Sequence, residues 1–197
     1  MALTVAFVRH RERRDRIYVT RQDGTSIFWD FPSYGDRLPH DLIHLVVEDG
    51  LGIVNSFWGM VDAGADVTLI DNQATLVRHG RPLVEQPGVD FSDLMQAEEA
   101  VALLGPTGMR TEQVGAITVA RLDSASSGTP PENLLGSDLG CEPLAQRSAQ
   151  EIASIRQRLH DLGQQWRDLF DGAAITLTFA GPVQHPPGPQ TPSRGGR

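Results

Sequence analysis

Residues 3–31 read LTVAFVRHRERRDRIYVTRQDGTSIFWDF. Two runs rich in β-branched and aromatic residues, 3–9 and 16–21, are joined by a charged turn, and a third run, 25–31, follows a glycine-containing turn at 22–24. Apolar runs separated by short polar turns predict an antiparallel meander of three strands. This sheet decides the fold class, because other elements must then cover one of its faces.

Helix signals follow the meander. Pro39 suits the first turn of a helix, which we expect to run to about Glu48 or Asp49 and to stop at Gly50 and Gly52. A second, shorter apolar helix is predicted over residues 53–63. The chain therefore places two helices directly after the sheet.

Two further helices are predicted closer to the C-terminus. Residues 92–104 are helical in pattern, with Ser92 as the N-cap. Ser148 and Glu151 form a capping-box signature. The helix they open carries an apolar seam at residues 152–169, at alternating spacings of three and four. We expect the seam to pack on the core, and the alternative is a dimer interface, which would make the protein a homo-oligomer.

The remaining segments are shorter or more polar. Residues 115–121 and 173–180 are predicted strands, the latter joining the sheet, whereas 67–70 and 74–77 fit a strand or a helix equally well. Residues 123–143 are rich in Ser, Gly, Pro and acids, which predicts a mobile loop. The Pro- and Gly-rich residues 182–197 predict a disordered tail.

Size and composition bound the architecture. With 197 residues, 40% of them hydrophobic and 21% charged, the chain has the composition of a globular protein and the length of one ordinary domain. We therefore predict a single α+β domain over residues 1–181. Its antiparallel sheet would combine the N-terminal meander with a C-terminal strand, packed by three or four helices.

Charge and cysteine usage limit the partners and the compartment. The net charge is −8, and the acidic excess lies in residues 38–145, so nucleic acid is a poor candidate partner. The one basic cluster, Arg9 to Arg16, fits either a solvated turn or an RNA or anion patch. All 17 basic residues are arginine, which we attribute to codon usage in a GC-rich bacterium. A single cysteine, Cys141, excludes an internal disulfide and agrees with a reducing compartment.

Membrane and export signals are missing from the sequence pattern. No apolar stretch approaches the roughly 18 to 20 residues that a bilayer span needs. The N-terminal positive charge follows a short apolar run, the reverse of a secretory signal. We therefore expect a cytoplasmic protein.

One constellation carries chemistry. His40 and His44 lie four residues apart on the first predicted helix, a spacing that puts both imidazoles on one face within reach of one divalent cation. Asp41 and Glu48 fall within about 100° of the same helical arc. This pattern predicts a metal site, for zinc or another divalent metal.

The order His-Asp-x-x-His resembles the zincin motif His-Glu-x-x-His, in which the histidines bind zinc and the acid is the general base. The resemblance implies a metal-dependent hydrolase with His40 and His44 as ligands and Asp41 as the base. Asp41 is one methylene shorter than the family's glutamate, which puts that role in doubt.

Glu48 is expected to act differently from the histidines. It lies eight residues from His40, about 12 Å of helix rise, so the two cannot share an ion. Its spacing from His44 fits a hydrogen bond that fixes the imidazole tautomer. The third ligand must then come from elsewhere in the fold, and spacing does not choose among the candidates Asp36, Asp62, Asp66, Asp71, His79 and Glu85.

Two other readings of the histidine helix stay open. The polar stripe fits a solvated helix face, although such a face would more typically carry Arg, Glu or Gln. His and Glu could also serve acid–base chemistry without a metal.

A wider resemblance covers about half of the chain. The segment LPHDLxHxxVE at 38–48, followed by Phe-Trp-Gly at 57–59 and Ala-Gly-Ala at 63–65, is similar to a group of small bacterial proteins of unknown function. The resemblance implies no activity. Three function classes therefore remain: a metal-binding protein, a non-catalytic interaction or structural domain, and an RNA-associated factor that uses the Arg9 to Arg16 turn.

Overall fold

The computed structural model describes residues 2–31, 35–70, 73–106, 109–114, 117–122 and 141–180. Helices and antiparallel strands are both present, which confirms the α+β class. No helix in these ranges is long and apolar enough to cross a bilayer. The other residues, which include 123–140 of the predicted loop and the predicted tail, lie outside the described part of the chain.

The main sheet has four strands in the order β3-β2-β1-β9, and every neighbouring pair is antiparallel. Its strands are β1 (Leu3–Val8), β2 (Asp15–Thr20), β3 (Ser26–Phe31) and β9 (Ala174–Phe179). Val5 of β1 lies opposite Val19 on one side and Leu177 on the other. The meander and its C-terminal partner strand were thus predicted correctly.

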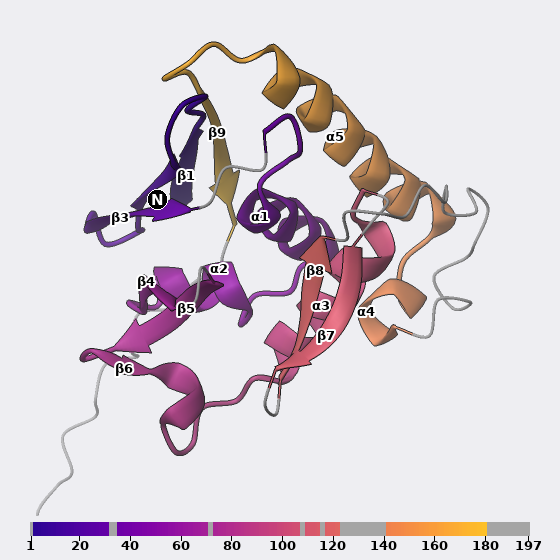
Figure 1. Ribbon diagram of the computed structural model, residues 1–197. Helices are drawn as coiled ribbons and strands as arrows, with labels where there is room; N and C mark the ends of the chain where they lie inside the picture. Colours follow the sequence, from indigo (N-terminus) through magenta and orange to yellow (C-terminus); the bar gives the residue numbers. More distant parts are fainter. Residues whose placement is uncertain are drawn as a thin grey trace, which may run out of the picture.

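Helix α1 (His40–Leu51) lies at the centre of the molecule, between the sheet and helix α3 (Ser92–Leu104) (Figure 1). Helix α5 (Ala149–Asp168) also packs on α1, and the short α2 (Phe57–Asp62) follows it in the chain. Eight of the twelve α1 residues are buried, His44 and Glu48 among them. Core residues therefore pack around most of the circumference of α1, whereas an amphipathic surface helix buries only one face.

Two smaller antiparallel sheets complete the described fold. β4 (Asp66–Ile70), β5 (Gln73–Arg78) and β6 (Arg81–Pro82) form one, followed by the 3-10 turn η1 (Leu83–Glu85). β7 (Met109–Val114) and β8 (Ile117–Leu122) form the other. The two ambiguous segments at 67–70 and 74–77 are therefore strands, and the strand predicted from residue 115 begins at Ile117.

Several predicted boundaries were wrong. Gly50 does not stop α1 but lies inside it, and the helix ends at Leu51 with Gly52 in the left-handed conformation (φ 67°). The second helix is shorter than predicted, because residues 53–55 form the connection and Ser56 is its N-cap. Phe91, not Ser92, precedes α3 as its N-cap.

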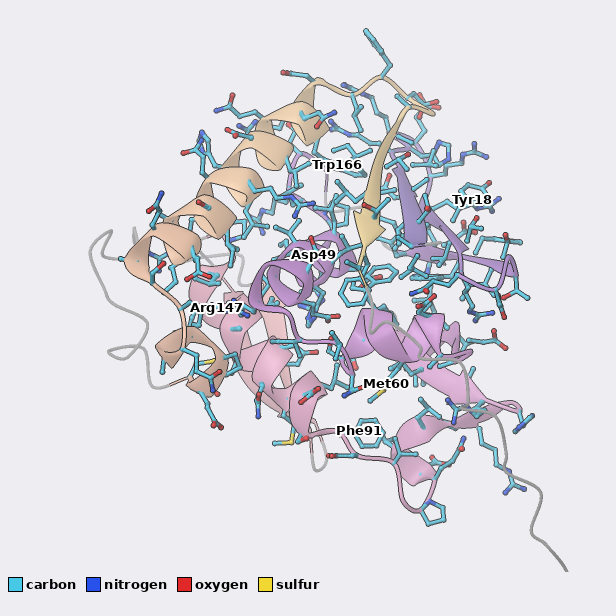
Figure 2. The ribbon with its side chains drawn as sticks, turned by 180° about the vertical axis from the view of Figure 1, so that it is seen from behind. Tyr18, Asp49, Met60, Phe91, Arg147 and Trp166 are labelled. Carbon is cyan, nitrogen blue, oxygen red and sulfur yellow. The ribbon has the colours of Figure 1, made fainter. Side chains whose placement is uncertain are left out.

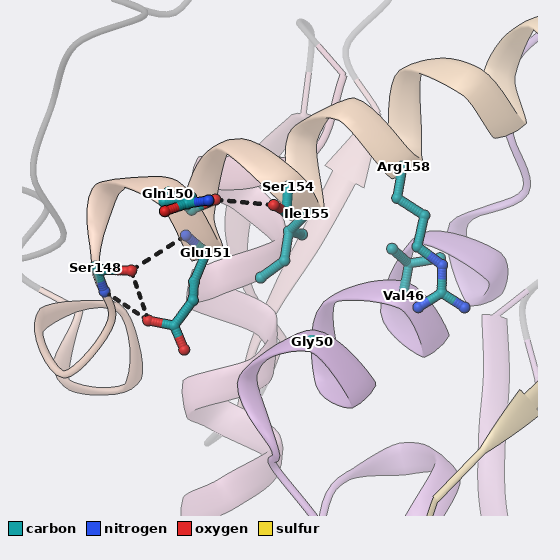
Figure 3. A pocket seen from close by; sticks show the side chains of 8 residues that line it. All are labelled: Val46, Gly50, Ser148, Gln150, Glu151, Ser154, Ile155 and Arg158. Atoms are coloured by element: carbon teal, nitrogen blue, oxygen red, sulfur yellow. Dashed lines mark hydrogen bonds between the residues drawn. The ribbon is translucent and has the colours of Figure 1, made fainter.

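The predicted capping box at the start of α5 is present. The Glu151 backbone N–H donates to Ser148 Oγ at 3.3 Å, and the Ser148 N–H donates to Glu151 Oε2 at 2.8 Å (Figure 3). The seam residues Ile152, Ile155, Leu159, Leu162 and Trp166 are buried. Trp166 lies on the side of α5 that faces the sheet (Figure 2). The seam therefore packs on the chain's own core.

The predicted loop ends earlier than expected. Cys141 is buried and forms the N-cap of the short helix α4 (Glu142–Ala145), so residues 141–143 belong to an ordered turn of helix. Burial also raises the pKa of the Cys141 thiol, which disfavours a nucleophilic thiolate there.

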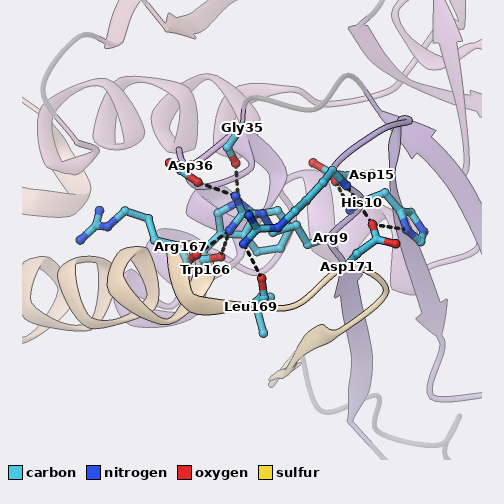
Figure 4. A network of polar contacts seen from close by, with 10 residues as sticks. Arg9, His10, Asp15, Gly35, Asp36, Trp166, Arg167, Leu169 and Asp171 are labelled. Atoms are coloured by element: carbon cyan, nitrogen blue, oxygen red, sulfur yellow. Dashed lines mark hydrogen bonds and ion pairs between the residues drawn. The ribbon is translucent and has the colours of Figure 1, made fainter.

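The arginines of the β1–β2 turn bind the C-terminal end of α5 (Figure 4). Arg9 is buried, donates to the carbonyl oxygens of Trp166 and Arg167, and forms an ion pair with Asp36. The Arg11 N–H donates to Asp171 at 2.9 Å. These contacts join the sheet to α5 and use part of the basic cluster inside the molecule.

Candidate metal centre

His40 and His44 lie side by side on the first turns of α1. Their ring centroids are 4.6 Å apart and their planes meet at 66°. Nε2 of each ring is buried and forms no hydrogen bond with the residues that the structure describes. The predicted spacing therefore brings two imidazole nitrogens into one buried space.

Glu98 of α3 supplies a third ligand atom. One atom each from His40, His44 and Glu98 lies within 4.8 Å of the other two. His44 Nε2 is 3.4 Å from Glu98 Oε2. Tetrahedral zinc, with ligands at about 2.0–2.1 Å, needs ligand atoms about 3.4 Å apart, so small side-chain rotations would close the set around one ion.

The third ligand was missed in the sequence because only packing of α3 on α1 brings it to the histidines. One signal was nevertheless present. Glu98 follows Leu94 by four residues and precedes Val101 by three, so it lies within the apolar face of α3, where an acid is costly unless it has a partner. A charged residue inside an apolar helical stripe is the pattern that would have identified it.

None of the described third-ligand candidates belongs to this cluster. Asp36 pairs with Arg9, Asp62 accepts hydrogen bonds from Gln22, and Asp66 pairs with Arg21. His79 lies in the turn after β5, and Glu85 ends η1. Asp71 lies outside the described residues.

Glu48 holds the second nitrogen of His44, as its spacing predicted. Its Oε1 is 3.0 Å from His44 Nδ1, and its Oε2 accepts the Trp58 backbone N–H at 3.0 Å. The side chain is 0% exposed. Because both oxygens have partners, Glu48 is suited to fix the ring and tautomer of His44 rather than to move a proton.

Asp41 lies beside the cluster without joining it. Its Oδ2 accepts a hydrogen bond from Trp29 Nε1 at 3.3 Å, and its Oδ1 is 4.0 Å from His40 Nδ1. Burial raises the pKa of this carboxyl group to about 6. A carboxyl group with such a pKa can exchange a proton near neutral pH.

The two histidines have opposite protonation tendencies. Burial, with a smaller contribution from His44, lowers the pKa of His40 to about 4, so this ring is neutral at pH 7. Burial on its own would also lower the pKa of His44, but Glu98 and Glu48 outweigh it and raise that pKa to about 10. Without a cation, the cluster is therefore an imidazolium held between two glutamates.

The start of α2 fixes the geometry around the cluster. Besides the bond to Glu48, Trp58 donates its indole N–H to the Asp41 carbonyl at 3.0 Å, and the Phe57 ring lies 6.5 Å from the His44 ring. Gly59 permits this arrangement, because a Cβ atom there would lie 1.7 Å from the Val54 carbonyl oxygen. The Phe-Trp-Gly segment is thus a support for the histidine helix.

The three side chains of the cluster differ in exposure, although the Nε2 atoms of both histidines are buried. The His40 side chain is 23% exposed, compared with 4% for His44 and 9% for Glu98. Two imidazoles and one carboxylate with a further open position are the ligand set of catalytic zinc sites, whereas structural sites have four protein ligands. With three protein ligands, the residues present fit the ligand count of a catalytic zinc site rather than that of a structural one.

Comparisons with protein-family models, with curated protein sequences and with solved structures give no significant match for this chain.

Proposed function

We propose that this chain is a metal-binding protein that holds a divalent ion, zinc in the first instance, through His40, His44 and Glu98. The observation that carries the proposal is the convergence of the buried Nε2 atoms of His40 and His44 with the carboxylate of Glu98 from another helix, which already lies 3.4 Å from His44 Nε2. Glu48 Oε1 is placed to accept a hydrogen bond from His44 Nδ1 on the far side of the ring, which supplies the outer partner that metal-binding histidines usually have.

Charge balance favours a divalent ion over an empty site. Two glutamates, Glu48 and Glu98, are buried beside the histidines. Buried carboxylates are costly unless a cation compensates them, and a divalent ion supplies two positive charges where a protonated His44 supplies one.

The enzymatic version of the proposal is a metal-dependent hydrolase. A divalent ion with an open position lowers the pKa of bound water and polarises a carbonyl or phosphoryl oxygen. Asp41 is the candidate for proton transfer, since its raised pKa of about 6 lies close to neutral pH and its Oδ1 is 4.0 Å from His40 Nδ1. The bond to Trp29 holds its carboxylate in place.

The two other function classes have less support. The Trp166-bearing seam of α5 is buried in the core, which leaves it no free face for a partner. In the basic turn, Arg9 and Arg16 pair with Asp36 and Asp30. Neither feature offers a surface as specific as the histidine cluster.

Elemental analysis of the purified protein, beside the double variant His40→Ala, His44→Ala, tests the proposal. We expect about one equivalent of metal in the native chain and none in the variant. His160→Ala, an exposed histidine on α5, is the matched control and should keep its metal. If native protein and double variant hold the same amount, or if the native protein takes up no metal after incubation with zinc, the proposal is wrong.

A variant that keeps the shape separates metal binding from folding. Glu98→Gln preserves the side-chain size and removes the carboxylate charge. Loss of zinc affinity with an unchanged circular dichroism spectrum supports a ligand role for Glu98. Unchanged affinity would assign Glu98 to an ion pair with His44 only.

A further inference from the structure

A second site, whose lining does not include the histidine cluster, lies along residues 156–167 of α5, C-terminal to the capping box. It is a pocket of about 370 Å³ between α5, α1, the end of α3 and the segment that precedes α1. This volume is within the range of small-molecule sites. The pocket has a buried apolar floor made of Leu38, Ile43, Leu104 and Leu159.

Three arginines, Arg37, Arg156 and Arg167, line the same pocket. Within the described part of the chain, none of their side chains forms a hydrogen bond or an ion pair. Arg21 and Arg158 pair with Asp66 and Asp49, whereas Arg78 and Arg81, which do not line this pocket, also form no side-chain hydrogen bond or ion pair with the described residues. The chain has more acidic than basic residues, with a net charge of −8, so a shortage of acids does not explain why these three arginines lack partners.

The α5 side of the pocket is built on one helical face. Arg156, His160, Gly163 and Arg167 follow at spacings of four, three and four residues. Gly163 lies beside Leu38 in the pocket lining, where a Cβ atom would contact the Leu38 side chain at 3.8 Å and a larger side chain would take up part of the space. The Arg167 guanidinium extends away from the Arg9 cluster (Figure 4).

The remaining charged groups of the pocket do not cancel the arginines. Asp36 also lines it, but its carboxylate forms the ion pair with Arg9. His160 Nε2 is 2.6 Å from the Gln164 amide nitrogen. The pocket therefore combines an uncompensated positive rim with an apolar floor.

We propose that this pocket binds a small amphiphilic anion, with a carboxylate or phosphate head at the arginines and a short apolar body on the leucine-rich floor. Guanidinium groups bind both kinds of head through paired, charge-assisted hydrogen bonds. Binding of the apolar body is stabilised because its surface and that of the pocket floor are both buried away from water. The proposal does not depend on the metal centre.

Isothermal titration calorimetry with four probes tests this site. Octanoate and octyl phosphate carry head and body, whereas acetate and inorganic phosphate carry the head alone. We expect at least one octyl probe to bind, and to bind more tightly than its head-only counterpart. Preference for one octyl probe identifies the head as carboxylate or phosphate.

Variants separate the charges from the cavity. Arg156→Gln and Arg167→Gln should each weaken binding of the octyl probe by about tenfold or more, as expected for loss of a charge-assisted hydrogen bond. Gly163→Leu keeps every charge, adds an apolar side chain to the lining beside Leu38 and should weaken binding by narrowing the pocket, while its better helix propensity preserves the fold. The exposed Arg81→Gln is the control and should bind as the native chain does.

Three results would overturn the proposal. Neither octyl probe binds at millimolar concentration, or head-only probes bind as tightly as octyl probes, or Gly163→Leu binds normally. Melting curves of each variant show that a loss of binding is not a loss of fold.

Discussion

Helices α1 and α5 differ in how much of their surface is exposed to solvent. α5 buries one stripe and exposes the rest, and a side-chain capping box opens it. α1 is buried on most sides and has no side-chain cap, yet it carries His40, His44 and Glu48. Water solvates the polar residues on the exposed face of α5. The same residue types inside the core must be held by partners, which is why the proposed metal site lies on α1.

The largest effect is expected from the core of α5. Trp166 is fully buried, and its replacement by Ala removes the largest side chain of the seam. We expect a loss of about 3–5 kcal/mol in unfolding free energy, measured by urea denaturation. Gln165→Ala, on the exposed face beside it, should change stability little. Equal effects of the two variants would show that the seam is not packed as described.

The next effect tests the polar interior of α1. Glu48→Gln keeps the volume but alters the acceptor that holds His44 Nδ1. We expect zinc affinity to fall by about 10–100-fold, the usual effect of losing an outer partner of a metal ligand. Competition with a chromogenic chelator measures it.

The control for this variant is Glu151→Gln, in which the altered acid lies on exposed α5. It should leave zinc affinity unchanged. If Glu48→Gln binds zinc as the native chain does, Glu48 has no part in the site.

The point where the two helices meet gives a smaller effect. A Cβ atom on Gly50 of α1 would lie 2.7 Å from Ile155 Cγ1 of α5. Gly50→Ala should therefore cost about 1–3 kcal/mol by overpacking, despite the better helix propensity of Ala. The double variant Gly50→Ala, Ile155→Val restores space and should recover part of the loss in thermal denaturation. A stabilised single variant would contradict the close contact.

The cap of α5 gives the next smaller effect. Ser148→Ala removes the acceptor for the Glu151 N–H and should cost about 1 kcal/mol in urea denaturation. Ser154→Ala, on the exposed face of the same helix, is the control. An effect no larger than that of the control would mean that tertiary contacts alone define the start of α5.

The smallest effect is a pH dependence of the same cap. Hydrogen bonds from the Ser148 backbone N–H and hydroxyl lower the pKa of Glu151 below its ordinary value. A carboxyl group with a lowered folded-state pKa contributes stability above its unfolded pKa, and this contribution is lost as pH falls through the folded value. The stability difference between the native chain and Glu151→Gln should therefore shrink between pH 7 and pH 3. A difference that is constant with pH would exclude the contribution.

Features set by local sequence patterns could be predicted, whereas features set by contacts between distant parts of the chain could not. The strands of the meander and helix α5 were predictable because period-two runs, the capping box and the 152–169 seam are local patterns. Gly50 was mistaken for a helix end because its role, close contact with Ile155, depends on a residue more than 100 positions away. Local sequence patterns therefore predict helices and strands but not the contacts between them.

The candidate site was half predictable for the same reason. The spacing of His40, His44 and Glu48 is a property of one helix, and the structure keeps it. The position of Glu98 beside the histidines depends on how α3 packs on α1, so it could not be predicted from residue spacing. Asp41 was interpreted as a base by its position between the histidines, and the structure turns its carboxylate toward Trp29.

X-ray absorption spectroscopy at the zinc edge, on protein loaded with one equivalent of zinc, tests the central claim most directly. The account predicts a first shell of two imidazole nitrogens and oxygen at about 2.0–2.1 Å, with the imidazole signal lost in His40→Ala, His44→Ala. A shell that lacks imidazole, or one that the double variant leaves unchanged, would contradict it.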